Sequence, residues 1–189
     1  MYPAAEMHYS TRMKSFVFTL GLLLLIQGFA AERLSPPNMY EHPTLKGGSA
    51  IHWHQFSWGL KDAKRVVVYY GTPRKWGKTT KLAEATVEID DFEFYAKSVT
   101  LSPDLAEKVT ALVLNPLSFS EYRGLKLCGG FHPDFCIEWQ FEEEGQRWHS
   151  RAFACLGCDE WRLIDSSSAV HTDMPKETAD ELLRLIPKR

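Results

Sequence analysis

The chain has 189 residues, enough for one domain of ordinary size, and its 44% apolar and 24% charged residues are typical of a soluble globular protein. Its formal net charge of −2 argues against a nucleic-acid-binding protein, because phosphate recognition normally needs a basic face. We therefore expect no nucleic-acid partner.

The first segment, residues 1–30, predicts a signal peptide. Arg12 and Lys14 precede the apolar run SFVFTLGLLLLIQ, and Gly28 and Ala30 occupy the small-residue positions of a cleavage site after Ala30. The expected location is therefore secreted or periplasmic, with no membrane association beyond this segment. The alternative is an uncleaved N-terminal helix that anchors the protein, because the uncharged run is at the lower length limit of a spanning helix.

Residues 31–50 contain three prolines and a Gly-Gly pair without periodicity, which predicts an extended lead-in. A single domain is expected over residues 51–189. Runs of β-branched and aromatic residues predict its first strands at 66–71, 85–90 and 92–101.

A helix is predicted directly after these strands. Ser102 suits the N-cap position and Pro103 the first helical turn, and apolar residues then recur at helical spacing. Asn115 and Pro116 end this helix, because the residue before a proline disfavours the helical conformation.

The segments 135–141 and 147–154 predict a β-hairpin. A two-residue Glu144-Gly145 turn fixes the register, because loop length sets strand pairing. The register places three pairs opposite each other, namely Glu142 with Arg147, Glu138 with Arg151 and Phe141 with Trp148. Opposite charges on one face and aromatic rings on the other both stabilise a ladder, so the two faces support the same register.

A short final strand is predicted at 161–165 and a helix at 174–186, with Leu182, Leu183 and Ile186 as its apolar stripe. The order of strands, helix, strands and helix predicts an α+β domain. We expect a mostly antiparallel sheet with one helix between strand groups, one C-terminal helix, and the helices packed on one face.

The four cysteines occupy two short stretches, CGGFHPDFC and CLGC. In an exported chain, this even number predicts disulfides among Cys128, Cys136, Cys155 and Cys158. The hairpin register places Cys136 and Cys155 diagonally on one face, which favours Cys136–Cys155 nested inside Cys128–Cys158. The diagonal separation of about 7–8 Å is long for a disulfide, so this pairing requires local distortion.

Two alternatives to disulfides stay open. The first is a zinc-type metal site formed by Cys128, His132, Cys155 and Cys158, or by all four cysteines, because C-x-x-C supplies half of a typical zinc site. The second is a thiol-redox pair in the C-x-x-C motif. Such a pair normally sits at a helix N-terminus, whereas this motif lies between two predicted strands. Without zinc, no cofactor is expected.

The stretch HWHQFSW would place His52 and His54 on one face if it forms a strand. Two histidines in this arrangement can bind a metal, but a half-buried aromatic strand that carries histidines is the simpler interpretation. A basic loop later in the chain could meet an anionic ligand, although a solvated loop is the plainer interpretation. Its candidate ligand-binding residues are Arg74, Lys75, Trp76 and Lys78.

The second half of the chain, roughly residues 92–165, resembles a group of small exported bacterial proteins of unknown function. The resemblance rests on a C-x(3–4)-P turn with a nearby histidine, followed by a strand and a C-x-x-C segment. The matching residues are Cys128, His132, Pro133, Cys155 and Cys158. The resemblance implies no activity.

No G-x-S-x-G, P-loop or dinucleotide-binding motif occurs in the chain. We therefore expect a non-enzymatic, exported binding or envelope-associated protein stabilised by disulfides, with metal binding as the alternative and thiol redox chemistry as the second alternative. The sequence specifies no ligand or partner.

Overall fold

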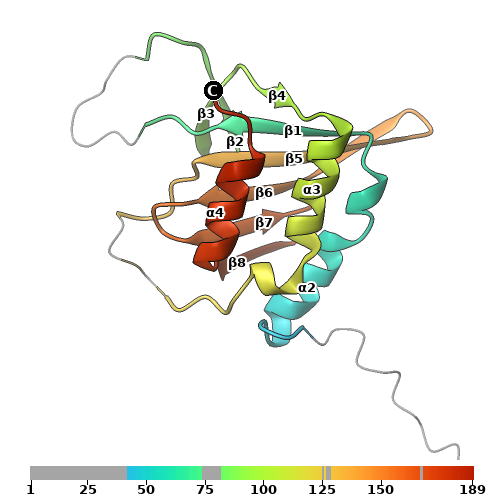
Figure 1. The fold of residues 1–189 in the computed structure, drawn as a ribbon. Helices are drawn as coiled ribbons and strands as arrows, with labels where there is room; N and C mark the ends of the chain where they lie inside the picture. Colours follow the sequence, from blue (N-terminus) through green and yellow to red (C-terminus); the bar gives the residue numbers. More distant parts are fainter. Residues whose placement is uncertain (1–41, 74–81, 125, 127–128, 167) are drawn as a thin grey trace, which may run out of the picture. The chain divides into compact units, whose positions relative to one another are not determined.

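The structure is a computed structural model that describes residues 42–73, 82–124, 126, 129–166 and 168–189 (Figure 1). The predicted signal peptide and most of the predicted lead-in lie outside the described residues. Within the described part, no helix has the length and apolar character needed to cross a membrane.

A six-stranded antiparallel sheet forms the centre of the domain, with the strand order β4-β1-β5-β6-β7-β8. The strands are β1 (Arg65–Tyr70), β4 (Val99–Thr100), β5 (Phe135–Glu143), β6 (Gln146–Cys155), β7 (Glu160–Ile164) and β8 (Ala169–Asp173). A separate hairpin of β2 (Thr86–Ile89) and β3 (Phe92–Tyr95) packs on one face of this sheet. The predicted α+β class is confirmed.

Three helices cover the opposite face of the sheet (Figure 1). They are α2 (Gly47–Ser57), α3 (Pro103–Leu114) and α4 (Lys176–Leu185). Each buries large side chains against the sheet, so the main core lies between the helices and the strands.

The predicted β5–β6 hairpin is confirmed together with its register. Glu144 and Gly145 both have positive φ values, 51° and 80°, as a tight two-residue hairpin turn requires. Glu142 pairs with Arg147, whose Nε lies 3.1 Å from the Glu142 carboxylate. The register follows from a turn that suits glycine and from charges that match across the ladder.

The other two predicted cross-strand pairs also form. Arg151 Nε donates to Glu138 Oε2 at 2.7 Å, and Arg151 Nη1 reaches Asp90 Oδ2 at 2.9 Å. The rings of Phe141 and Trp148 stack with their centroids 5.8 Å apart. Because Asp90 lies in the turn between β2 and β3, Arg151 also ties that small hairpin to the main sheet.

The predicted helices after the strands are both present. The N–H of Leu105 lies 3.4 Å from Ser102 Oγ, which caps the start of α3 as expected. Leu182 in α4 and Ile186 at its C-cap are buried, but Leu183 is 51% exposed. The inclusion of Leu183 in the apolar stripe was wrong, because adjacent residues in a helix point about 100° apart.

The N-terminal boundary and the first element differ from the prediction. Helix α2 begins at Gly47, and Leu45 and Ala50 are buried, so the domain includes part of the expected lead-in 31–50. The HWHQFSW stretch is helical rather than extended. The sequence indicates this helix only through the spacing of Trp53 and Phe56, which are three residues apart and both buried. The helix is not otherwise amphipathic.

Two further corrections concern the strands. The run 92–101 is divided between β3 and β4, which belong to different sheets. The segment at 161–165 is not the final strand, because β8 follows it and pairs with it. The sequence of β8, AVHTD, contains few apolar residues, so no β-branched or aromatic run indicated this edge strand.

Candidate functional site

Cys136 and Cys155 lie on the same face of the sheet, as the register predicted. Cys136 is paired with Phe153, two residues before Cys155 on the adjacent strand. Both side chains are buried, and Cys136 forms no disulfide in the structure, so the predicted Cys136–Cys155 disulfide is not present. The reason is the diagonal placement, since about 7–8 Å between backbone positions is too long for a disulfide without backbone movement.

The environment of Cys136 makes its thiol unreactive. Its side chain is fully buried in a small apolar cluster with Phe153, Phe94 and Ile89, beneath the β2–β3 hairpin. Burial raises the pKa of the Cys136 thiol well above its ordinary value, and the nearby Arg151 only partly opposes this effect. Because the thiolate is the nucleophile, Cys136 is suited to packing rather than to catalysis.

The C-x-x-C motif lies in a turn. Cys155 is the last residue of β6, residues 156–159 form the turn, and Glu160 starts β7. No helix begins within this turn. The motif therefore lacks the helix N-terminus that lowers a thiol pKa in redox-active pairs.

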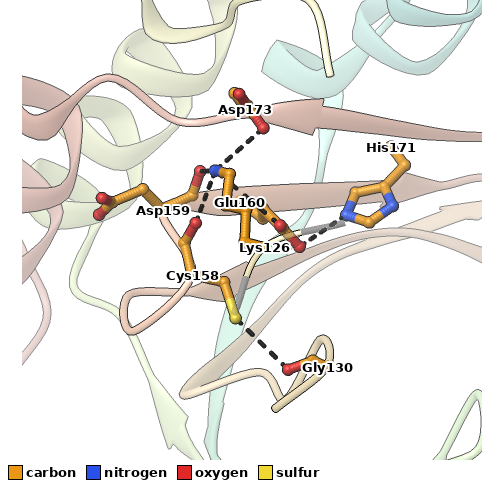
Figure 2. A network of polar contacts seen from close by, with 7 residues as sticks. All are labelled: Lys126, Gly130, Cys158, Asp159, Glu160, His171 and Asp173. Atoms are coloured by element: carbon orange, nitrogen blue, oxygen red, sulfur yellow. Dashed lines mark hydrogen bonds and ion pairs between the residues drawn. The ribbon is translucent and has the colours of Figure 1, made fainter. Parts of the chain in front are cut away.

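A network of polar contacts surrounds Cys158 (Figure 2). Lys126 Nζ donates to the carbonyl oxygens of Cys158 and Asp159 at 2.6 and 2.9 Å. The Cys158 sulfur lies 3.3 Å from the carbonyl oxygen of Gly130. Residues on both sides of Cys128 thus contact Cys158, although Cys128 itself lies outside the described residues.

The same network contains two buried carboxylates (Figure 2). Glu160 and Asp173 are paired across β7 and β8 and are only 2% and 7% exposed. Lys126 Nζ lies 3.0 Å from Asp173 Oδ1 and 3.9 Å from Glu160 Oε1, and His171 Nε2 lies 3.0 Å from Glu160 Oε2. Lys126 and His171 surround the buried negative charge, so this network holds the segment before β5 against the sheet.

The predicted metal ligands are not brought together within the described part of the chain. No three histidine, cysteine or carboxylate side chains gather there in a way that could hold a metal ion. His132 instead lines a small hollow of about 280 Å³ together with Asp134, Tyr95 and Gly157. The zinc alternative also requires Cys128, which lies outside the described residues, so it stays a prediction.

The other two predicted binding sites, the histidine pair and the basic loop, are not formed by the described residues. His52 and His54 lie on α2, where residues two apart point to opposite sides of the helix, so they do not share the face expected of a strand. The basic-loop residues Arg74, Lys75, Trp76 and Lys78 lie outside the described residues.

A hollow of about 710 Å³ opens between α3 and the edge formed by β1 and β4. The 3-10 helix η1 (Leu60–Asp62) completes its wall. The lining residues are Leu60, Lys61, Ala63, Lys64, Arg65, Val66, Thr100, Leu101, Pro103, Ala106, Glu107, Thr110 and Ala111. Its size matches the range of 300–1,000 Å³ that is common for small-molecule sites.

The sequence of α3 explains why a hollow forms here. Pro103, Ala106, Thr110 and Ala111 follow the spacing of one helix face, and all four side chains are short. A helix face with short side chains cannot fill the space in front of β1. Trp139 Nε1 donates to Thr110 Oγ1 at 2.9 Å, which fixes this part of α3 over the sheet.

The mouth of the hollow is positively charged. Lys61 and Lys64 line it, and neither forms an ion pair with another described residue. Arg65 contributes to the lining only from the start of β1, because its side chain lies on the other face of the sheet. Glu107 is the acidic residue in the lining. The sequence did not predict this site, because its walls come from η1, β1 and α3 and the only local signal is the cluster of cations before β1.

A second hollow of about 470 Å³ adjoins the first, because Lys64 lines both. Trp58 and Trp148 line the second hollow, and Trp58 is 88% exposed. An exposed aromatic ring beside a concave surface is characteristic of binding surfaces. The two hollows together make this end of the sheet the most promising binding region among the described residues.

The comparisons with known proteins do not narrow the assignment, because no protein-family model, curated protein or solved structure matches the chain.

Proposed function

We propose that the chain is an exported, non-enzymatic binding protein that holds a small ligand in the 710 Å³ hollow between α3 and β1. The observation that carries this proposal is a concave site with an apolar wall and uncompensated cations at its mouth. Apolar walls with a few polar groups at fixed positions are the common pattern of ligand pockets.

The composition of the lining supports binding rather than catalysis. Its charged residues are Lys61, Lys64, Arg65 and Glu107, and it includes no cysteine, histidine or serine. A Ser–His or Cys–His pair of nucleophile and base is therefore missing from this lining. The hollow can bind and orient a ligand without an evident means of transforming it.

Ligand binding is tested with N-phenyl-1-naphthylamine, a neutral dye whose fluorescence rises in apolar sites. We expect saturable binding to the purified protein and its loss in Ala106→Trp, because a large ring at Ala106 fills the hollow. The control is Ala96→Trp, which adds the same ring at an exposed position outside the hollow. Equal dye binding by both variants, or none by the wild-type protein, would reject the proposal.

We further propose that a Cys128–Cys158 disulfide stabilises the domain. The support is the contact that Lys126 and Gly130 both make with Cys158, which brings the two flanks of Cys128 to the partner cysteine. Closing this loop restricts the unfolded chain and should stabilise the fold by about 3–4 kcal/mol.

A thiol count separates the disulfide from its alternatives. In denaturant without reductant we expect two reactive thiols, Cys136 and Cys155, and four after reduction. Four thiols before reduction together with one bound zinc would establish the metal alternative instead. Mass spectrometry of the exported protein tests the signal peptide, for which the expected first residue is Ala31.

A further inference from the structure

We infer that the ligand of the α3–β1 hollow is an amphipathic anion, with an apolar chain in the hollow and a single anionic head group at its mouth. This inference rests on the proposed binding function and names the chemical class of the ligand. It follows from the separation of apolar and cationic groups within one site.

The apolar part of the site is continuous. Leu60, Val66 and Leu101 form the buried floor, and Ala106 and Pro103 on α3 face them. An alkyl chain placed there would be shielded from water along most of its length. Each methylene buried in this way strengthens binding about fourfold.

The cationic part lies on one side of the opening. Lys61 belongs to η1 and Lys64 stands just before the start of β1, so chain connectivity places two positive charges together. Arg65 is paired with Gln140, so its side chain lies on the other face of the sheet. The opposite wall contributes Glu107, and the three charged side chains together have a net charge of about +1. Lysine stems can lie along apolar surface while their ammonium groups reach an anion.

Other ligand chemistries fit this site less well. A neutral amphiphile would leave the two lysines without partners, and inorganic phosphate would leave the apolar floor exposed to water. A carboxylate, phosphate or sulfate on an alkyl chain satisfies both parts, since arginine and lysine bind all three anions.

The test displaces the neutral dye with octanoate, decanoate, dodecanoate, decyl phosphate and 1-decanol, all below their aggregation limits. We expect affinity to rise about fourfold per methylene in the carboxylate series. At low salt, decanoate and decyl phosphate should bind at least about tenfold more tightly than 1-decanol, and added salt should reduce this preference.

A charge-reversal pair identifies the residues responsible. In Lys61→Glu/Lys64→Glu the preference for decanoate over 1-decanol should disappear, while 1-decanol binds as in the wild-type protein. The control Lys46→Glu/Lys188→Glu makes the same change in net charge at exposed positions outside the hollow and should keep the preference.

The outcomes distinguish the two proposals. Absence of dye binding would reject the binding site itself. Dye binding with equal displacement by decanoate and 1-decanol, or a preference that survives charge reversal, would overturn only the anionic assignment. Sedimentation with phosphatidylglycerol vesicles separates a free amphiphile from a membrane surface, and vesicle binding without displacement of the dye by decanoate would also overturn it.

Discussion

Replacing Lys126 with methionine is expected to destabilise the domain strongly. The ammonium group of Lys126 donates to two carbonyl oxygens, those of Cys158 and Asp159, and lies 3.0 Å from the Asp173 carboxylate. Methionine keeps most of the side-chain volume but removes all of these interactions. The Asp173 carboxylate then stays buried without its cation, and Glu160 loses the nearby positive charge.

The size of the effect follows from burial. Removing one partner of a buried ion pair typically costs 3–5 kcal/mol, because the remaining charge is left uncompensated. Lys126 is 29% exposed, so water can reach part of the site and the lower end, about 3 kcal/mol, is expected. Such a loss is a large fraction of the 5–15 kcal/mol that stabilises a typical domain.

Urea unfolding followed by fluorescence measures the change. The control is Lys176→Met, which breaks only the exposed Lys176–Asp180 pair on α4 and should leave the free energy of unfolding almost unchanged. The double variant Lys126→Met/Asp173→Asn should recover part of the loss, because it removes the uncompensated charge. If Lys126→Met and Lys176→Met are equally stable, the buried network does not contribute to the stability of the fold.

Three further predictions concern single side chains. Thr110→Val should lower the free energy of unfolding by about 1–3 kcal/mol, because the buried Trp139 N–H loses its acceptor. Thermal unfolding measures this change, and an unchanged stability would show that the hydrogen bond is unimportant. The Cys136 thiol should react with a disulfide reagent only as fast as the protein unfolds, and rapid reaction of the folded protein would contradict its burial. Burial lowers the pKa of His42, whose Nδ1 accepts hydrogen bonds from the N–H groups of Thr44 and Leu45. The unfolded state therefore binds the proton more tightly, and stability should decline as the pH falls below about 6.5. His42→Asn, which keeps an acceptor but does not titrate, should decline less over this range, and identical pH profiles would exclude His42 as the cause.

The sequence predicted those parts of the fold where several local features, such as a turn, a cap or a matched pair, indicate the same element. The β5–β6 hairpin combines a Glu144-Gly145 turn with matched charges and stacked rings, so its register could be derived without the structure. Helix α3 combines a Ser102 cap with Pro103 in the first turn. Each of these signals lies within a few residues or across one tight turn.

The features that the sequence did not predict depend on tertiary contacts. Helix α2 begins with a Gly-Gly pair and has no apolar stripe strong enough to distinguish it from a strand. The absence of a disulfide between Cys136 and Cys155 depends on their diagonal separation across two strands. The binding hollow requires α3 to pass in front of β1, and the contribution of short side chains on α3 is visible only after this packing is known.

Nuclear magnetic resonance of the methyl-labelled protein tests the binding site most directly. Addition of decanoate should shift the methyl signals of Leu60, Val66, Leu101 and Ala106, which line the hollow, while those of Leu182 and Val170 elsewhere in the core stay unchanged. Saturation of these shifts at a one-to-one ratio would support the proposed ligand site. Unchanged lining signals at saturating decanoate, or shifts confined to residues outside the hollow, would contradict it.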